Sequence, residues 1–382
     1  MDHPHSFGHR PSGATIGLLS TFPPTRCGLA TFSQSLAAAL VEAHGASIRT
    51  VRVMDELAVP GSTPPARGQE VVAELVAGDA ASIAQAARAL SRTEVAVIQH
   101  EYGIYGGPDG AEVIEVMEQL TVPAVVVLHT VLETPSPSQR RVLERVASLA
   151  HAVVVMTTVA AEILERCYEV DSERVAVIAH GVPVWSAAER PVHRDRPRII
   201  TWGLIGPGKG LEWGVRAIAE LRAAGVTAHY TVYGQTHPKV LASHGEAYRD
   251  SLTALVAELG LENDVVLDGR YLDPAELAAA VAEADAVLLP YDSRNQVTSG
   301  VLVEALSAGK PVVATAFPHA LELLGGPQGR AVAHEDPSAM AHALAEVLAA
   351  GTAPARSTAL TWPEAGGRYL DLIGRLRVER AA

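Results

Sequence analysis

The sequence predicts an α/β protein with two doubly wound domains, each built around a parallel sheet. The chain has 382 residues, a length that suits two domains of about 100 to 200 residues each. Hydrophobic residues make up 48% of the chain and charged residues 19%, which is the composition of a globular protein. Short aliphatic runs alternate with stretches rich in Ala, Leu, Glu and Arg from end to end, the pattern of repeated strand–helix–strand units.

The aliphatic runs form two series, with helices expected between consecutive runs. In the first half they predict strands over residues 14–20, 47–53, 95–99, 124–129, 152–156 and 175–179. In the second half they predict strands over residues 198–203, 228–234, 265–268, 286–290, 311–315 and 330–333. Two separate sheets are therefore expected.

The domain boundaries follow from the polar segments. Residues 1–13 are polar and rich in His and Pro, so we interpret them as a disordered lead-in. Residues 186–197, SAAERPVHRDRP, are charged, contain proline and show no apolar periodicity, which indicates an interdomain linker. We place the first domain at 14–190 and the second at 191–361. Ligands of open α/β sheets bind at the carboxyl ends of the strands, so a cleft between the two sheets should carry the function.

Charge and cysteine content exclude several classes of protein. The net charge of −13 argues against a nucleic-acid partner. The two cysteines, Cys27 and Cys167, are too few for a disulfide framework and lack zinc-site spacing, which favours the cytoplasm and no metal. The apolar runs are far shorter than the roughly 20 residues of a spanning helix. Membrane contact is expected to be peripheral at most, at a patch such as Arg140, Arg141 and Arg145 that can equally be a solvated helix face.

Two loops of the first domain are candidate ligand sites. The loop STFPPTRCGLATF follows the first strand, and Gly28 opens the next helix, where free amides and the helix dipole can hold an anion. Alternatively, Gly28 only permits a tight turn and Arg26 is solvated. The second loop follows the strand at 95–99 and crowds polar and aromatic residues before a Gly-Gly pair, which favours a site for a hydroxyl-rich ligand. Its candidate residues are His100, Glu101, Tyr102 and Tyr105.

Histidines also follow the strands at 124–129 and 175–179. These are His129 and His180, which with His100 place three histidines at the same sheet edge. Metal binding is the tempting interpretation, but isolated histidines without a carboxylate at short spacing suit hydrogen bonding better. A metal site is therefore not expected.

The second domain opens with a glycine-rich turn after its first strand. Glycines stand at positions 203, 206, 208 and 210, with Lys209 among them, a composition typical of a phosphate cradle. The turn lacks the Ser or Thr of a Walker A loop and the GxGxxG spacing, which disfavours kinases, ATPases and nicotinamide enzymes. A glycine turn with a surface lysine is the simpler alternative, although the chain has three lysines against 27 arginines.

A second phosphate site is predicted near residue 300. Thr298 or Ser299 would cap the helix that follows and leave its amides facing the cleft. Glu304 lies one turn into this otherwise apolar helix, where a carboxylate needs hydrogen-bond donors. The hydroxyls of a ribose could supply them.

These motifs together carry a family resemblance. The glycine turn with Lys209, the Pro290-Tyr291 strand end and the segment EALSAGKPVVAT that begins at Glu304 resemble the retaining GT-B glycosyltransferases of the family-four type. The RCGLATF loop, the HGVP turn and a last helix that contains Trp362 agree with this resemblance. It covers essentially the whole chain after the lead-in.

The resemblance implies a fold and an activity. In this family two Rossmann-like domains face a central cleft, the first binds the acceptor, the second binds the nucleotide sugar, and the last helix, here residues 362–380, packs back on the first domain. The implied reaction moves a hexosyl group from a UDP- or GDP-linked sugar to a hydroxyl of a glycan, lipid or small molecule. It needs no metal and no cofactor besides the nucleotide sugar as co-substrate.

The resemblance also assigns residues. Lys209 would contact the donor diphosphate, Glu304 the ribose and His129 the transferred sugar, and these three would be the catalytic set. The remaining donor-binding candidates are Gly28, Gly203, Arg270, Tyr271, Gln296, Thr298, Ser299 and Gly300. The acceptor-binding candidates are Arg26, His100, Glu101, Tyr102 and Tyr105.

Two positions depart from the family pattern. Leu204 stands where an arginine usually precedes the lysine by five positions, and Gln296 replaces the first of two usual glutamates. Arg26 or Arg294 could supply the missing cation. An epimerase of the same fold is one alternative, and a catalytically silent nucleotide-sugar-binding protein, suggested by Leu204 and Gln296, is another.

Overall fold

The first sheet has seven parallel strands in the order β3-β2-β1-β4-β5-β6-β7. The computed structural model describes residues 13–54, 69–185, 196–326, 328–351 and 359–381. The strands are β1 (Thr15–Ser20), β2 (Ser47–Met54), β3 (Gln69–Val76), β4 (Val95–His100), β5 (Ala124–Leu128), β6 (Ala152–Val155) and β7 (Val175–Val177). The helices of this domain are α1 (Gly28–Glu42), α2 (Ala80–Leu90), α3 (Glu112–Glu118), α4 (Pro137–Leu149) and α5 (Thr158–Cys167), with short 3₁₀ turns at Pro108–Gly110 and Ser172–Arg174.

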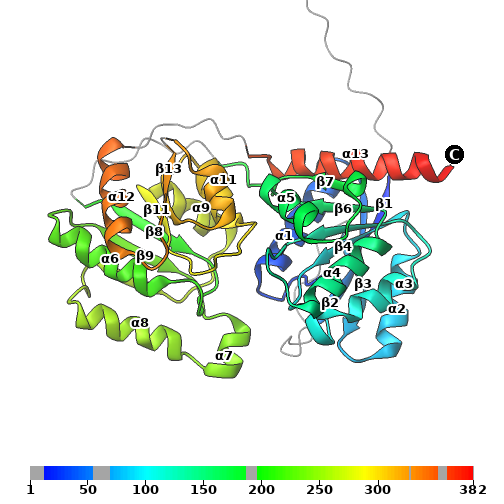
Figure 1. The fold of residues 1–382 in the computed structure, drawn as a ribbon, viewed down its shortest axis with the longest axis horizontal. Coiled ribbons are helices and arrows are strands. Elements are labelled where there is room, and N and C mark those ends of the chain that lie inside the picture. Colours follow the sequence, from blue (N-terminus) through cyan, green and yellow to red (C-terminus); the bar gives the residue numbers. More distant parts are fainter. Residues whose placement is uncertain (1–12, 55–68, 186–195, 327, 352–358, 382) are drawn as a thin grey trace, which may run out of the picture.

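The second sheet has six parallel strands in the order β10-β9-β8-β11-β12-β13. The strands are β8 (Arg198–Trp202), β9 (His229–Tyr233), β10 (Val265–Asp268), β11 (Ala286–Leu289), β12 (Val312–Thr315) and β13 (Gly329–Val332). The helices are α6 (Leu211–Ala223), α7 (Pro238–His244), α8 (Ala247–Glu258), α9 (Pro274–Glu283), α10 (Gly300–Ser307), α11 (Pro318–Leu323) and α12 (Pro337–Ala350). The predicted α/β class with two parallel-sheet domains is confirmed, and Figure 1 shows the two domains side by side.

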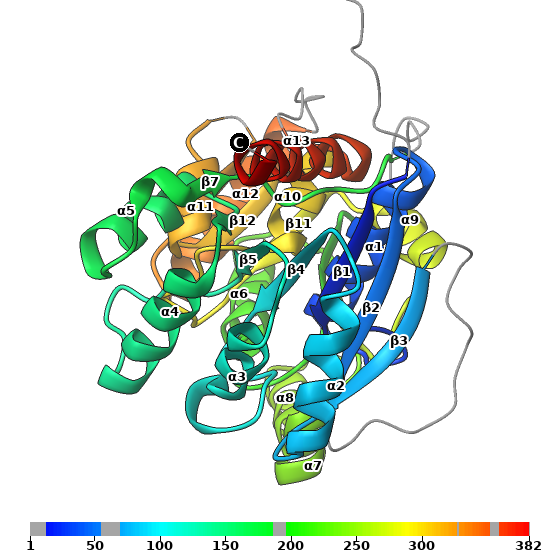
Figure 2. The ribbon, with the colours of Figure 1, turned by 90° about the vertical axis from the view of Figure 1, so that its right-hand side faces the viewer.

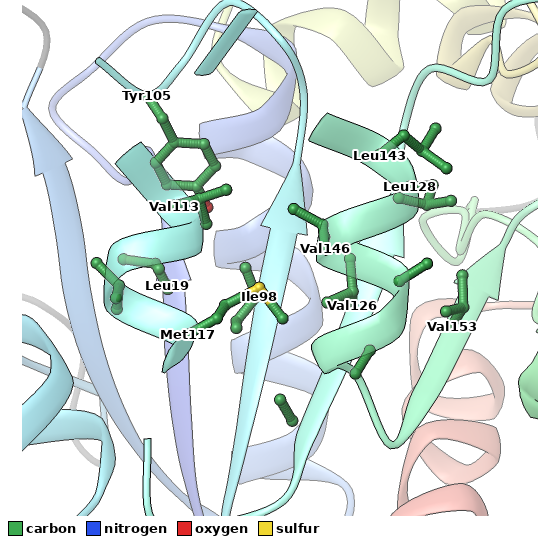
Figure 3. Close-up of a cluster of buried hydrophobic side chains, with 14 of the residues drawn as sticks. Leu19, Ile98, Tyr105, Val113, Met117, Val126, Leu128, Leu143, Val146 and Val153 are labelled. Atoms are coloured by element: carbon green, nitrogen blue, oxygen red, sulfur yellow. The ribbon is translucent and has the colours of Figure 1, made fainter. Parts of the chain in front are cut away.

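Aliphatic side chains cover both faces of the first sheet, as a buried parallel sheet requires. On one face the strands pack against α2, α3, α4 and α5 in a cluster that includes Leu19, Ile98 and Val126; Figure 3 shows its centre. On the other face they pack against α1 and the last helix, α13 (Trp362–Ala381), through residues such as Leu36 and Tyr369. Figure 2 shows α13 on the side of the sheet opposite α2, α3 and α4.

The chain therefore returns to its first domain at the end. Thr361 forms a parallel bridge with Val182, and α13 then lies along α1. A helix is expected at 362–380, and the structure has one at Trp362–Ala381. The predicted linker at 186–197 and the lead-in at 1–13 fall almost entirely outside the described residues.

Each strand predicted from the sequence forms, within two residues at either end, but β3 was not predicted. β3 lies at the edge of the sheet, and several of its side chains are exposed between buried ones. Its sequence, QEVVAELV, therefore lacks the continuous apolar run that marks the central strands.

Candidate functional site

The crossover points of the two sheets face a shared cavity of ≈ 1660 Å³. In the first sheet successive strands are added toward one edge up to β3 and toward the other edge from β4, so the order switches between β1 and β4; in the second sheet it switches between β8 and β11. Ligands of doubly wound folds bind at these points because adjacent loops diverge there. The cavity is lined by the loops after these strands, by the start of α10, and by His180 with residues 183–185.

Lys209 lies in the turn between β8 and α6 on the cavity wall. Its ammonium group is 4.4 Å from the ring centroid of Tyr291, a cation–π contact. Burial lowers the pKa of Lys209 to about 8, because the charged form is poorly solvated. No carboxylate pairs with Lys209 within the described residues, so the ammonium is available to an anion in the cavity.

Glycines let the chain approach itself closely in this turn. Gly203, on the cavity wall, has a φ of 122°, a value that L side chains rarely adopt. A Cβ on Gly210, whose φ is 58°, would lie 2.0 Å from the carbonyl oxygen of Pro290. The glycines therefore bring the Lys209 turn against the end of β11. Leu204, the departure from the family pattern, does not line the cavity.

The start of α10 presents free amides to the same cavity. The Ser299 hydroxyl caps the helix by accepting a hydrogen bond from the amide of Leu302 at 3.3 Å. The amides of Gly300 and Val301, in the first turn, have no hydrogen-bond partner among the residues that the structure describes. The Thr298 hydroxyl is likewise buried without a partner there. Free amides at a helix N-terminus bind anions.

His319 in α11 holds this loop in place and was missed by the sequence analysis. Its Nδ1 accepts a hydrogen bond from the amide of Ser299 at 2.9 Å, and its own amide donates to the carbonyl of Gln296 at 3.3 Å. The Gln296 side-chain amide donates to the carbonyl of Thr298 at 3.2 Å. A histidine directly after a proline at a helix start gives no sequence signal for this role.

Glu304 lies one turn into α10 on the cavity wall. One carboxylate oxygen accepts a hydrogen bond from the indole nitrogen of Trp202 at 3.3 Å. Burial raises the pKa of Glu304 to about 7, because a single neutral donor compensates the charge only in part. A ligand with two hydroxyl donors would satisfy this carboxylate.

Arg270 and Tyr271 line the cavity beyond β10. The Arg270 guanidinium pairs with the Asp268 carboxylate at 2.8 Å, an interaction that lowers the pKa of Asp268. The Tyr271 hydroxyl is 3.1 Å from the Thr31 hydroxyl of the first domain. Tyr271 therefore connects the two domains across the cavity.

Arg26 lies on the cavity wall but reaches across to the second domain. Its guanidinium donates to the Gln235 side-chain oxygen at 2.9 Å and stands 5.8 Å from the ring centroid of Tyr271. This arrangement differs from the expectation that Arg26 faces the acceptor in the first domain. Arg294, the other candidate for the missing cation, is exposed, pairs with Glu335 and does not line the cavity.

Gly28 is the first residue of α1 and lies on the cavity wall. Its φ is not positive, and a Cβ built on it would meet nothing within 4 Å. Neither a tight turn nor packing therefore requires glycine at this position. The open space next to its backbone is consistent with a ligand that approaches closely.

His129, at the end of β5, lies among aromatic rings. Its ring makes an edge contact with Phe32 at 4.8 Å between centroids, and Phe32 also contacts His180 and Trp362. Burial, with the nearby His180 and His100, lowers the pKa of His129 to about 3, so this imidazole is neutral at pH 7. His180 packs on α10, since a Cβ on Gly300 would lie 3.0 Å from its Nε2.

One of the four residues expected in the β4 loop lines the cavity. Glu101 does so, and its carboxylate accepts hydrogen bonds from the Thr130 hydroxyl and, at 3.0 Å, from the Tyr102 amide. Burial raises the pKa of Glu101. This carboxylate and Thr130 form a polar corner on the first-domain side.

The other three expectations in this loop need correction. His100 is fully buried, with its ring edge against Tyr102, and neither residue lines the cavity. Tyr105 belongs to the core cluster, points toward Val113 in Figure 3 and donates its hydroxyl to the Gln99 carbonyl at 2.6 Å. The turn after β4 packs the apolar rings of Tyr102 and Tyr105 against the core, where their burial is favourable, instead of opening into the cavity.

Two of the three arginines in the expected membrane-contact patch pair with glutamates of the same domain. Arg140 contacts Glu144, and Arg145 pairs with Glu118 at 2.5 Å, which leaves Arg141 as the patch residue without a partner in the described chain.

None of the described helices has both the length and the apolar character that a membrane span needs. The described residues also contain no cluster of three or more His, Cys, Asp or Glu side chains placed to hold a metal.

Comparisons with known proteins show which family the chain resembles. The family described as Glycosyltransferase Family 4 matches residues 27–185, and the one described as Glycosyl transferases group 1 matches residues 196–350. The D-inositol 3-phosphate glycosyltransferase of Xylanimonas cellulosilytica is 30% identical over 301 residues, which cover 69% of each chain. The chain belongs to glycosyltransferase family 4.

Two further proteins resemble this glycosyltransferase. A GDP-mannose-dependent α-(1-6)-phosphatidylinositol monomannoside mannosyltransferase of Mycolicibacterium smegmatis is 28% identical over 206 residues, 49% of this chain and 50% of the relative. The Anabaena HepE protein, solved in complex with UDP, superposes with a TM-score of 0.65 at 15% identity over 96% of this chain and 98% of its own. The glycosyltransferase therefore has a GT-B fold, and its domains match the family from α1 to α12.

Proposed function

We propose that this glycosyltransferase moves a hexosyl group, with retention of configuration, from a UDP- or GDP-linked sugar to a hydroxyl of a glycan, lipid or small-molecule acceptor. The observation that carries the proposal is the meeting of three groups on one wall: the free amides of α10, the Lys209 ammonium and the Glu304 carboxylate. The amides suit the oxygens of a diphosphate, and the ammonium suits the negative charge that develops on the diphosphate as it leaves. The carboxylate suits the hydroxyls of a ribose. The relative named as GDP-mannose-dependent supports a nucleoside diphosphate sugar as donor.

In this arrangement the diphosphate lies against the start of α10. The amides of Gly300 and Val301 and the hydroxyl of Thr298 donate hydrogen bonds to its oxygens. Lys209 approaches the same oxygens from the opposite loop, and its charge matters most as the bond to the sugar breaks. Helix amides and the lysine together supply the positive charge, so the proposed reaction needs no divalent metal.

The proposed retention comes from attack on the face that the diphosphate leaves, and the two cavity glutamates, Glu304 and Glu101, have binding roles. Glu304 binds ribose hydroxyls, and Glu101 with Thr130 binds hydroxyls of the acceptor, so neither attacks the sugar. The departing diphosphate oxygen then takes the acceptor's hydroxyl proton on the same face. The bond from the anomeric carbon to the diphosphate breaks as the bond to the acceptor oxygen forms. His129 faces the transferred sugar as a neutral hydrogen-bonding group.

The proposal is tested with nucleotide sugars and chelator. A panel of UDP-, GDP- and ADP-linked hexoses is screened for a rise in Tm, because a ligand that binds the native state stabilises it. The stabilising donor is then incubated with polyol, glycan and lipid acceptors, with and without EDTA, and the anomeric configuration of the product is read by NMR. We expect a product with the donor's configuration and no effect of EDTA. Inversion, or loss of activity restored by magnesium, would refute the corresponding part of the proposal.

Epimerisation or silent binding gives different results in the same assay. An epimerase converts the donor's sugar without any acceptor, and a silent binding protein raises Tm but releases no nucleoside diphosphate from the donor.

The pH dependence of kcat/KM for the donor should be bell-shaped. Glu304 must be deprotonated to accept ribose hydroxyls, and burial raises its pKa to about 7, so kcat/KM should rise through pH 7. Lys209 must be protonated, and burial lowers its pKa to about 8, so kcat/KM should fall above pH 8. In Lys209→Arg the guanidinium stays charged, so the alkaline limb of the profile should move to higher pH while the acid limb stays near pH 7. An unmoved alkaline limb would exclude Lys209 as its origin.

A further inference from the structure

Gln99 is the next-to-last residue of β4 and His129 directly follows the neighbouring strand β5, and their side chains meet at the edge of the cavity. The Gln99 side-chain oxygen is 2.7 Å from Nε2 of His129. Gln99 is fully buried, with 0% of its surface exposed, whereas His129 lines the cavity. This is the one hydrogen bond that the Gln99 side chain makes within the described residues, where its amide nitrogen has no partner.

The contact determines which ring nitrogen carries the proton. An amide oxygen only accepts hydrogen bonds, so Nε2 of His129 must be the donor. Since the imidazole is neutral, Nδ1 then carries a lone pair and no proton. Nδ1 has no hydrogen-bond partner in the described part of the chain, and the edge contact with Phe32 fixes the plane of the ring.

We propose that Gln99 is a positioning residue that holds His129 in the Nε2–H tautomer, so that Nδ1 accepts a hydrogen bond from a hydroxyl of the transferred sugar. The assignment of that hydroxyl rests on the proposed function. The tautomer itself does not, because the contact exists in the protein without ligand.

His180 provides an internal reference for this assignment. Its Nδ1 lies 2.7 Å from the carbonyl oxygen of Gly181, which also can only accept, so His180 must carry its proton on Nδ1. The two cavity histidines are therefore expected in opposite tautomers.

The test is an NMR measurement of histidine tautomers in the full-length protein at neutral pH without ligand. Histidine-labelled wild type is compared with His129→Asn and His180→Asn, which assign the two signals. We expect Nε2–H for His129 and Nδ1–H for His180. In Gln99→Met, which keeps the length of the side chain but removes the acceptor, the His129 signal should shift toward a mixture of tautomers. Thr50→Val removes another buried polar atom without a partner in the described first domain and should leave His129 unchanged.

Two results would overturn the proposal. One is Nδ1–H for His129 in the wild type. The other is an unchanged His129 tautomer in folded Gln99→Met. In turnover, Gln99→Met should lower kcat about tenfold with little change in donor KM, since the sugar hydroxyl is positioned for reaction rather than for ground-state binding. If the protein binds no nucleotide sugar, the proposed function fails while the tautomer assignment stands.

Discussion

Replacing Lys209 with alanine should lower kcat about 100- to 1000-fold, with a much smaller rise in donor KM. The ammonium stands on the Tyr291 ring with no carboxylate partner among the described residues, so its charge is free to act on the diphosphate. Removing one preorganised donor from developing negative charge costs about 2.7 to 4 kcal/mol in transition-state stabilisation. The diphosphate carries less additional charge in the bound donor than at bond breaking, so ground-state binding should suffer less. Steady-state kinetics with the stabilising donor measure both constants.

Lys209→Met and Lys209→Arg are the matched controls. Met preserves the stem over Tyr291 and should behave like Ala if charge is what matters, whereas Arg keeps the charge and should restore part of kcat. Circular dichroism establishes that each variant folds. Wild-type turnover in folded Lys209→Met would remove Lys209 from the reaction.

Replacing Glu304 with alanine should raise the donor KM roughly ten- to hundredfold and leave kcat and the acceptor KM close to wild type. Hydrogen bonds to a charged group contribute about 1.5 to 3 kcal/mol, and ribose hydroxyls do not change during the transfer, so their loss weakens ground and transition states equally. Donor titrations at saturating acceptor measure the effect.

The alanine variant also leaves the Trp202 indole nitrogen without its acceptor, so a second variant separates folding from binding. Glu304→Gln keeps a carbonyl oxygen for Trp202 but removes the charge. It should fold like the wild type and still raise the donor KM. A donor KM equal to the wild type in both variants would mean that Glu304 does not bind the ribose.

The elements of the fold were largely predictable because burial on both faces imposes continuous aliphatic runs on central parallel strands. The run AVVVL of β5 is one such strand, and β3, half-exposed at the edge, shows the limit of that signal. The cavity residues next to glycines and helix starts were predictable for a similar reason. Lys209 lies in a glycine-rich turn, and Ser299 and Gly300 lie at the N-terminus of α10, and both kinds of site can be recognised from residues adjacent in the sequence.

What the sequence could not provide was the direction of side chains at strand ends. His100, Glu101 and Tyr105 are close in sequence, yet only Glu101 reaches the cavity, because the turn after β4 packs Tyr105 against the sheet. Arg26 lies in a predicted ligand loop, but its partner Gln235 is in the other domain.

By itself, then, the sequence determined the two sheets, the strand ends that face each other and the residue types available for a phosphate and a sugar. The tertiary structure decided which of those residues share a wall, and it alone revealed the contacts of His319 with Ser299 and of Gln99 with His129. These contacts join residues 20 and 30 positions apart. Their geometry depends on how neighbouring strands and helices pack, which no local pattern records.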